Sequence, residues 1–261
     1  MHGQKNYLMR TIMNQQQIDQ FREEGFCVLR NVIPPDVIRN LQNECERFIL
    51  EKDAEMDRKG VAVDEINHKG KRYFIALRYK DSEAMQNWIF GKRMEEVVKA
   101  VLGENVYLFL EQYVVKAADK GMKFSWHQDS GYLPFDHKPY LSCWCPLDDV
   151  TEENGTVYML PYKEAGTKDR IEHKLQEGTN DMVGYFGVNP GIPVVAKAGD
   201  IALFSSTCFH RSGSNNTNKS RRVLLIQYSP EPILKDNKPL YWAEPFIIDG
   251  NNVKEFHLER K

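Results

Sequence analysis

The sequence predicts a mainly β protein whose core is a double-stranded β-helix (a cupin-like jelly roll) with N-terminal helices packed outside it. After Gly103, short runs rich in β-branched and aromatic residues alternate with Gly, Pro, Asn and Asp, as in strands joined by turns. Tight-turn signals at 154–155 and 199–200 favour antiparallel strands over repeating βαβ units. No Gly/Pro/Ser-rich linker interrupts the 261 residues, so we expect a flexible leader over 1–13 and one domain over 14–261.

The segment 14–103 is predicted to be helix-rich. Asn14 and Gln17 form a capping-box pattern that predicts the start of a helix, and Gly25 is expected to end this helix. A strand, "FCVLR", follows. Apolar residues at three- and four-residue intervals predict a second helix that opens at 34–36 and runs up to the charged stretch near 52–59, and a third helical region over about 82–102.

The segment 104–230 is predicted to hold the β-helix core, and 231–261 is predicted to be a C-terminal extension. The strand candidates within the core are "NVYLFLEQYVV", "PYLSCWCPL", "GTVYMLP", "IPVVAK", "GDIALFSS" and "RRVLLIQYSP".

Composition limits the classes of partner. The formal net charge of −2, from 35 Lys and Arg against 37 Asp and Glu, lacks the positive excess typical of nucleic-acid binders. No apolar run is long enough to predict a membrane span. We therefore expect a small-molecule partner, with no nucleic acid and no membrane, and the sequence leaves the oligomeric state open.

The five cysteines are odd in number and scattered, and no signal peptide or peroxisomal C-terminus is evident. This pattern favours a reducing, cytoplasmic location and buried, unpaired thiols. Cys143 and Cys145 have no second cysteine pair with which to complete a zinc site.

One short stretch, "FSWHQDSGY", carries a candidate metal site. His127 and Asp129 are two positions apart, and on an extended backbone such residues share one face. The pair alone fits a surface turn equally well. His210, which ends a predicted strand far along the chain, supplies a second imidazole. Two imidazoles and one carboxylate occupy one face of an octahedron and leave the opposite face open, as in non-heme Fe(II) oxygenases.

Arg221 fits the same chemistry. A 2-oxoglutarate that chelates iron leaves its distal carboxylate in need of a cation, and a guanidinium binds a carboxylate through two parallel hydrogen bonds. Arg222 is adjacent, but alternation along a strand means that only one of the two can face the barrel.

The motifs "HQDSGYLPF", "CW", "ENGTVYMLP", "AGDIALF" and "FHRSGSNNTNKSRR", in this order, resemble the phytanoyl-CoA dioxygenase family of Fe(II)/2-oxoglutarate oxygenases, which includes ectoine hydroxylase. The likeness covers most of the chain, including the opening "IDQFREEGFCVLRNVIPP". It implies Fe(II) as cofactor, 2-oxoglutarate and O2 as co-substrates, and release of succinate and CO2.

The resemblance also assigns residues. His127, Asp129 and His210 match the iron ligands. The positions that match the family's 2-oxoglutarate pocket are Arg221, Ser212, Trp144, Gln128 and Gln112.

The residue at position 129 distinguishes hydroxylases from halogenases among the enzymes that the chain resembles. Related halogenases have a small residue at this position, which frees a coordination site for chloride. The retained carboxylate favours a hydroxylase, or another oxidative outcome, over a halogenase. The chain departs from the family at Tyr162-Lys163-Glu164, where a Gly or Ser and a histidine are usual, so the resemblance does not assign the contacts of the 161–195 region.

The sequence leaves several alternatives open. The same fold and ligands would serve a non-catalytic sensor of metal and 2-oxoglutarate, or a zinc hydrolase, although Arg221 and Ser212 would have no role in the latter. The substrate is open among acyl-CoA thioesters, amino-acid derivatives and natural products. His137 is a candidate for substrate contact, and His173 is interpreted as a solvent-facing or local hydrogen-bonding group. The run "RYFIALRYK" fits either a strand that lines the entrance, where Arg78 could contact an anionic substrate, or a solvated face.

Overall fold

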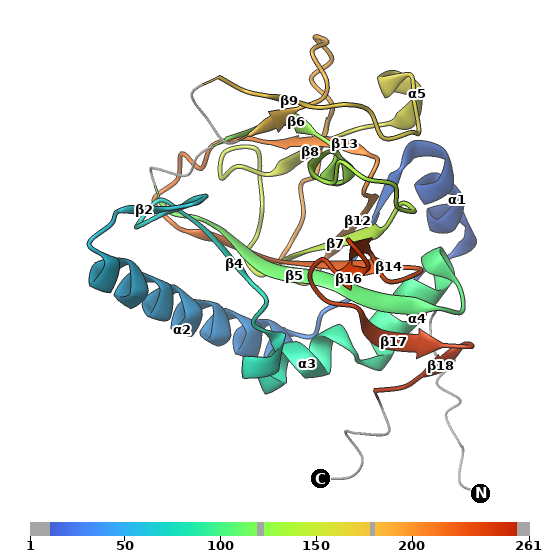
Figure 1. Cartoon of the computed structure of the whole chain (residues 1–261), viewed down its shortest axis with the longest axis horizontal. Helices are drawn as coiled ribbons and strands as arrows, with labels where there is room; N and C mark the ends of the chain where they lie inside the picture. Colours follow the sequence, from blue (N-terminus) through green and yellow to red (C-terminus); the bar gives the residue numbers. More distant parts are fainter. Residues whose placement is uncertain (1–10, 119–122, 178–180, 255–261) are drawn as a thin grey trace, which may run out of the picture.

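The computed structural model describes residues 11–118, 123–177 and 181–254, and its core consists of two facing antiparallel sheets (Figure 1). The larger sheet has the strand order β1 (Phe26–Leu29), β12 (Ile201–Ser205), β7 (Leu141–Pro146), β14 (Arg221–Ser229), β5 (Val106–Lys116), β4 (Arg72–Ala76), β3 (Asn67–His68), β2 (Val63–Asp64). The smaller sheet has the order β11 (Ile192–Pro193), β8 (Val157–Leu160), β13 (Phe209–Ser212), β6 (Phe124–His127). This arrangement confirms the predicted jelly-roll core.

The helices lie outside the sheets, also as predicted (Figure 1). They are α1 (Gln15–Glu24), α2 (Pro35–Lys59), α3 (Glu83–Ile89), α4 (Lys92–Leu102) and the short α5 (Tyr162–Ala165). Helices α2 and α4 contact strands of the larger sheet and cover its outer face. At the first helix both halves of the capping box form, and Gly25 adopts a left-handed conformation (φ 87°) that ends it.

Alternation along β14 determines which side chains enter the barrel. Leu224, Ile226 and Tyr228 belong to the hydrophobic cluster between the larger sheet and the helices, whereas Val223 and Leu225 belong to the cluster inside the barrel. The odd-numbered side chains of β14, including that of Arg221, therefore face the interior.

Two segments outside the predicted core add strands to the larger sheet. Residues 63–76 lie in the helix-rich part, yet they form β2, β3 and β4 and extend the larger sheet. In the C-terminal extension, β17 (Glu244–Ile248) pairs with β5 and with β18 (Asn251–Asn252), so this segment is part of the same sheet. These additions follow from free strand edges, which acquire new hydrogen-bond partners when a neighbouring segment pairs with them.

The remaining elements are small. Two hairpins, β9–β10 (Lys174–Leu175 and Met182–Val183) and β15–β16 (Leu234–Lys235 and Lys238–Pro239), and two 3₁₀ turns, η1 (Tyr79–Asp81) and η2 (Asp129–Tyr132), complete the structure. Met13, predicted as the last residue of the leader, is buried in the core, and residues 1–10 lie outside the described residues.

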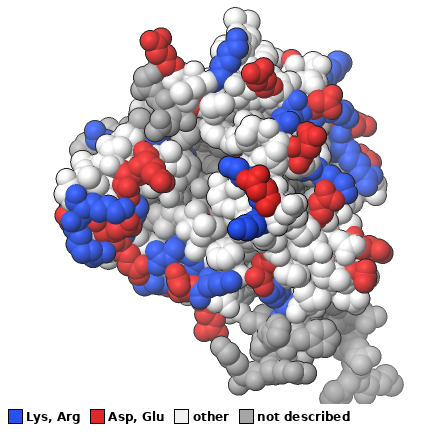
Figure 2. All heavy atoms as spheres, in the orientation of Figure 1, with Lys and Arg blue, Asp and Glu red and all other residues white. Residues whose placement is uncertain are grey.

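All five cysteines are buried and unpaired, which confirms the prediction for the thiols. In the part of the chain that the structure describes, no helix has both the length and the apolar character needed to cross a membrane. Figure 2 shows acidic and basic side chains interspersed over one face of the molecule, in keeping with the nearly balanced composition.

Candidate metal centre and co-substrate pocket

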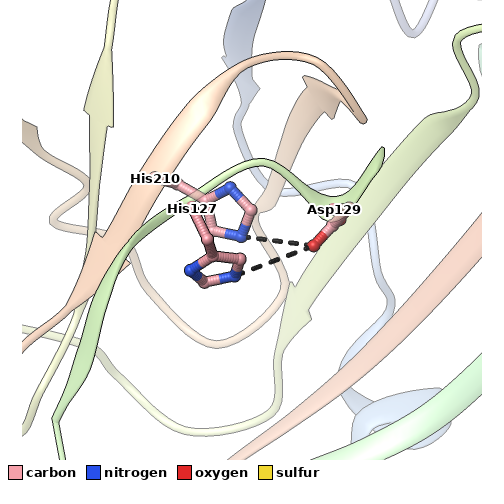
Figure 3. Close-up of side chains that lie close together, drawn as sticks. All are labelled: His127, Asp129 and His210. Atoms are coloured by element: carbon pink, nitrogen blue, oxygen red, sulfur yellow. Dashed lines mark ion pairs between the residues drawn. The ribbon is translucent and has the colours of Figure 1, made fainter. Parts of the chain in front are cut away.

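The three predicted metal ligands meet at one point inside the barrel. His127 ends β6 and His210 lies on β13, and the two residues are partners in the antiparallel ladder. Their ring centroids are 4.2 Å apart. Asp129, which begins η2, places Oδ1 3.9 Å from Nε2 of His127 and 3.5 Å from Nε2 of His210 (Figure 3). One ligand atom from each residue lies within 4.8 Å of the others, so the three can bind a single ion.

Backbone contacts orient both imidazoles toward this point. Nδ1 of His127 is 2.8 Å from the carbonyl oxygen of Ser125, and Nδ1 of His210 is 3.2 Å from that of Cys208. A carbonyl only accepts, so each Nδ1 carries the proton and each Nε2 presents its lone pair to the shared centre. Burial, followed by the neighbouring His210, holds the pKa of His127 well below its usual value. This imidazole is therefore neutral, as metal binding requires.

Two further side chains hold the carboxylate of Asp129. Ser142 Oγ donates to Oδ2 at 2.7 Å, and Gln227 Nε2 donates to the same oxygen at 2.8 Å. Gln227 Nε2 also lies 3.1 Å from Ser142 Oγ, and the two residues are ladder partners on β14 and β7. With Oδ2 occupied in this way, Oδ1 is the oxygen that faces the two imidazoles. The sequence interpretation missed both residues.

The metal-ligand cluster opens into a cavity of about 270 Å³ between the two sheets. Arg221 lines it and is 1% exposed. Its Nη2 donates to the carbonyl of Gly155 at 3.0 Å, while Nε and Nη1 have no hydrogen-bond partner among the described residues. Burial lowers the pKa of Arg221 to about 10, so the guanidinium remains charged at neutral pH. Buried donors of this kind normally have partners, so this pair points to an anionic ligand in the cavity.

A buried lysine lies beside Arg221. Lys116 and Arg221 are ladder partners, and Nζ of Lys116 donates to Ser212 Oγ at 2.8 Å and to the carbonyl of Gly213. Burial, followed by the charge of Arg221, holds the pKa of Lys116 well below its usual value. Because Ser212 Oγ accepts from the lysine, its own proton is free to be donated into the cavity, which Ser212 lines. Lys116 was also missed from sequence.

The other predicted pocket residues divide into two groups. Trp144 and Gln112 line the cavity, and the Trp144 ring centroid lies 5.6 Å from the guanidinium carbon of Arg221. Gln128 does not line it. Its Nε2 donates to the carbonyls of Asp169 and Thr207 at 2.8 and 2.7 Å, and its Oε1 accepts from the backbone N–H of Ile171.

The prediction that Gln128 contacts 2-oxoglutarate is therefore not supported by the geometry. Its side chain points away from the cavity because it alternates with His127 and Asp129, whose side chains point in.

A third buried histidine supports the ligand loop from behind. His173 is 7% exposed, and its Nε2 accepts from the backbone N–H of Gln128 at 2.8 Å. Its Nδ1 is 2.9 Å from the carbonyl of Ile171. A Cβ added at Gly131 would lie 2.3 Å from the His173 ring, so only glycine fits there. His173 is thus a local hydrogen-bonding group, as one of the two sequence interpretations had it, but it is not solvent-facing.

The two candidates for substrate contact lie elsewhere. His137 does not line the cavity, and its ring nitrogens contact the carbonyl of Phe135 and Ser130 Oγ at 2.9 and 3.0 Å. Arg78 forms ion pairs with Glu51 and Asp81 on the outer surface.

The jelly-roll core, the two-histidine, one-carboxylate cluster and the buried guanidinium define a non-heme iron dioxygenase of the 2-oxoglutarate-dependent class. The profile of the family described as "Phytanoyl-CoA dioxygenase (PhyH)" matches residues 21–223. The chain belongs to the phytanoyl-CoA dioxygenase family.

Individual relatives are distant. The chain is 25% identical to the peroxisomal phytanoyl-CoA dioxygenase of Mus musculus over 85% of this chain and 70% of the mouse protein. It is 22% identical to the ectoine dioxygenase of Stutzerimonas stutzeri, over 81% and 75% of the two chains.

Solved structures share the fold at lower identity. EvdO2 from Micromonospora carbonacea var. aurantiaca, complexed with 2-oxoglutarate, matches with a TM-score of 0.66 and 18% identity over 90% of this chain and 93% of that one. The carbocyclase SnoK from nogalamycin biosynthesis matches with a TM-score of 0.66 and 16% identity, over 95% and 91%.

Proposed function

We propose that this protein binds Fe(II) and 2-oxoglutarate and uses O2 to hydroxylate a small-molecule metabolite, with release of succinate and CO2. One observation carries the proposal: a cluster of two histidines and an aspartate shares its cavity with a buried guanidinium that has two unpartnered nitrogens. A metal alone would not require that cation.

The residues present fit both groups. His127, Asp129 and His210 would hold the iron, which supplies the activation of dioxygen. Arg221, which has two nitrogens without a partner among the described residues, would bind the distal carboxylate of 2-oxoglutarate. Ser212 would donate its hydroxyl proton to the same carboxylate, because its oxygen already accepts from Lys116. A dianionic co-substrate would also offset the charge of the buried cation.

The protein itself contributes position and exclusion of water. Trp144 forms part of the cavity wall beside Arg221, and its bulk keeps the carboxylate-binding end dry. Asp129 occupies a metal-ligand position that a halogenase would leave to chloride, which supports hydroxylation as the outcome.

The substrate is proposed only by class. Relatives bear the names phytanoyl-CoA dioxygenase and ectoine dioxygenase, and SnoK comes from nogalamycin biosynthesis. An acyl-CoA thioester, an amino-acid derivative and a natural product are thus all represented, and we propose a small molecule as substrate for this chain as well.

The test compares two adjacent arginines. Arg222 points to the opposite face of β14, where it pairs with Asp148 and Glu46, so Arg222→Met is the matched control for Arg221→Met. Anaerobic titration of the wild-type protein with Fe(II) and 2-oxoglutarate should give a weak visible charge-transfer band. Loss of one partner of a buried charge pair costs about 2–5 kcal/mol, so Arg221→Met should weaken 2-oxoglutarate binding by at least roughly 30-fold.

Turnover of labelled 2-oxoglutarate then separates the alternatives. Slow succinate release without substrate supports the enzyme, whereas tight binding with no release supports a sensor. If folded wild-type protein gives no charge-transfer band, or if the two arginine variants bind 2-oxoglutarate equally well, the proposal is wrong. Equal binding by the variants would also restore the hydrolase alternative, in which Arg221 has no role.

A further inference from the structure

The outer part of the cavity is built mainly from aromatic side chains. They come from both sheets and from the connecting loops: Phe74, Phe109, Phe124, Tyr132, Tyr140 and Tyr241. Aliphatic residues fill the spaces between them, Leu110 and Leu133 among others. Aromatic side chains therefore extend from the surroundings of the metal ligands, where Phe204 meets His210, to the exposed rings of Tyr132 and Tyr241.

Two of these rings remain open to solvent although they line a cavity. Tyr132 is 41% exposed and Tyr241 is 43% exposed. Tyr132 meets the imidazole of His127 edge-on at a centroid distance of 5.6 Å, and Tyr241 packs against Phe109 at 5.3 Å. The aromatic surface thus continues from a metal ligand to the mouth, and a flat apolar ligand that lies against it would remove it from water, which favours binding.

Arg211 is the cation of the described lining that is not assigned to 2-oxoglutarate, and its guanidinium is engaged elsewhere. Arg211 alternates with His210 and Ser212 on β13, so its side chain points out of the barrel. Its guanidinium lies 3.7 Å from the ring centroid of Tyr158 and donates to the carbonyl of Pro190 at 2.9 Å. The other arginine in the lining, Arg221, is the co-substrate ligand proposed above.

The described lining also includes one carboxylate besides that of Asp129, namely Asp181. Burial raises the pKa of Asp181, and the charges of Arg72 and Lys116 oppose that rise. Arg72 does not line the cavity. It packs against the wall, with its guanidinium carbon 4.8 Å from the ring centroid of Phe124. The phenols of Tyr132 and Tyr140, which also line the cavity, are neutral because burial raises their pKa.

We infer that the substrate is an uncharged, flat, aromatic or similarly apolar molecule whose reacting end enters the cavity while the rest lies against Tyr132 and Tyr241. The inference rests on the proposed function, because it assigns the polar end of the cavity to 2-oxoglutarate. The cavity of about 270 Å³ is smaller than those that enclose drug-sized ligands, about 300–1,000 Å³, so only part of the substrate fits inside. A coenzyme A thioester or a zwitterionic amino-acid derivative would bring charges that this wall does not pair.

The test measures binding of four probes by isothermal titration calorimetry on the full chain, with and without Ni(II) and 2-oxoglutarate. The probes are 2-naphthol, naphthalene-2-sulfonate, hexanoyl-CoA and L-proline. The first two share one ring system and differ in charge. We expect 2-naphthol to bind about ten-fold more tightly than the sulfonate, because the sulfonate would lose hydration without gaining a cation. Hexanoyl-CoA and L-proline should bind more weakly still.

A matched pair of variants locates the probe. Tyr241→Ala removes one ring of the mouth and should weaken 2-naphthol binding about five-fold. Phe186→Ala removes an aromatic ring that is 71% exposed and outside the lining, and it should leave the affinity unchanged. Thermal unfolding of both variants checks that each is folded.

Several outcomes overturn the inference: undetectable 2-naphthol binding, sulfonate or hexanoyl-CoA binding that is equal or tighter, or equal affinities in the two variants. Binding of 2-oxoglutarate, measured separately through Arg221→Met, keeps the two proposals apart. If 2-oxoglutarate binds and 2-naphthol does not, only the substrate class is wrong. If 2-naphthol binds and 2-oxoglutarate does not, the proposed function is wrong.

Discussion

Replacing Gln227 by leucine tests how the protein holds its metal-binding carboxylate. Gln227 Nε2 donates to Asp129 Oδ2 at 2.8 Å, and Ser142 Oγ donates to the same oxygen at 2.7 Å. Leucine has similar bulk but no donor. The variant keeps all three metal ligands and removes one of the two hydrogen bonds that hold Oδ1 toward the imidazoles.

The expected loss follows from these contacts. A hydrogen bond to a charged group contributes about 1.5–3 kcal/mol, which corresponds to roughly 10- to 150-fold in a binding constant. Loss of an outer partner of a metal ligand typically weakens metal binding by about 10- to 100-fold. Both figures indicate that Gln227→Leu should weaken Fe(II) binding by at least about ten-fold.

The assay is an anaerobic competition between the protein and a fluorescent chelator for Fe(II). Gln112→Leu is the matched control, because Gln112 lines the same cavity on the neighbouring strand β5 but makes no hydrogen bond to Asp129. It should retain metal affinity within about two-fold. Ser142→Ala should resemble Gln227→Leu, and the double variant should lose less than the two losses added together, because Ser142 and Gln227 also contact each other.

Metal affinity in Gln227→Leu within two-fold of wild type, in protein with an unchanged unfolding temperature, would refute the view that this pair positions Asp129. A ten-fold loss in the Gln112→Leu control would refute it as well, because the effect would then belong to the cavity in general.

Three further predictions concern the surroundings of the site. His173→Leu should weaken Fe(II) binding, because Gln128 loses the acceptor for its backbone N–H, and His173→Gln should restore part of it; equal metal affinities in the two variants would contradict this role. Gly131→Ala should lower the free energy of unfolding by about 1–3 kcal/mol through its clash with His173, while Gly213→Ala, whose Cβ finds no atom closer than 3.6 Å, should change it little in thermal unfolding. Burial raises the pKa of Glu111 to about 6, so the folded state binds more protons than the unfolded state and loses stability as the pH rises. Wild type should therefore lose about 1 kcal/mol between pH 5 and pH 7 relative to Glu111→Gln in denaturant unfolding, and parallel pH curves would contradict this.

Local pattern was sufficient for much of the fold. The capping box at Asn14 and the left-handed Gly25 lie where the residue types predict, because these signals act within a few residues of the chain. Strands β4 and β17 join the main sheet through β5, which lies far from each of them in the chain. Strand pairing of this kind depends on which edge is free after the barrel closes, and no local pattern records that.

The alternation of side chains along a strand would have excluded Gln128 from the cavity and would have identified Gln227 as a cavity residue. The argument that separated Arg221 from Arg222 also turns Gln128 away from His127 and Asp129, and it places Gln227 on the inner face of β14 with Arg221. Side-chain direction along a strand is thus readable from sequence once one residue of that strand is placed.

The sequence by itself determined the chemistry of the centre: two imidazoles, one carboxylate and one guanidinium, brought to notice by their types and order in the chain. Only the tertiary structure decided what surrounds them. Lys116 meets Ser212, and Ser142 and Gln227 meet Asp129, across strands that are distant in sequence. The type of each metal ligand is a property of a single residue and can be seen in the sequence. The orientation, burial and charge of that ligand depend on contacts between distant residues, which form only when the two sheets pack together.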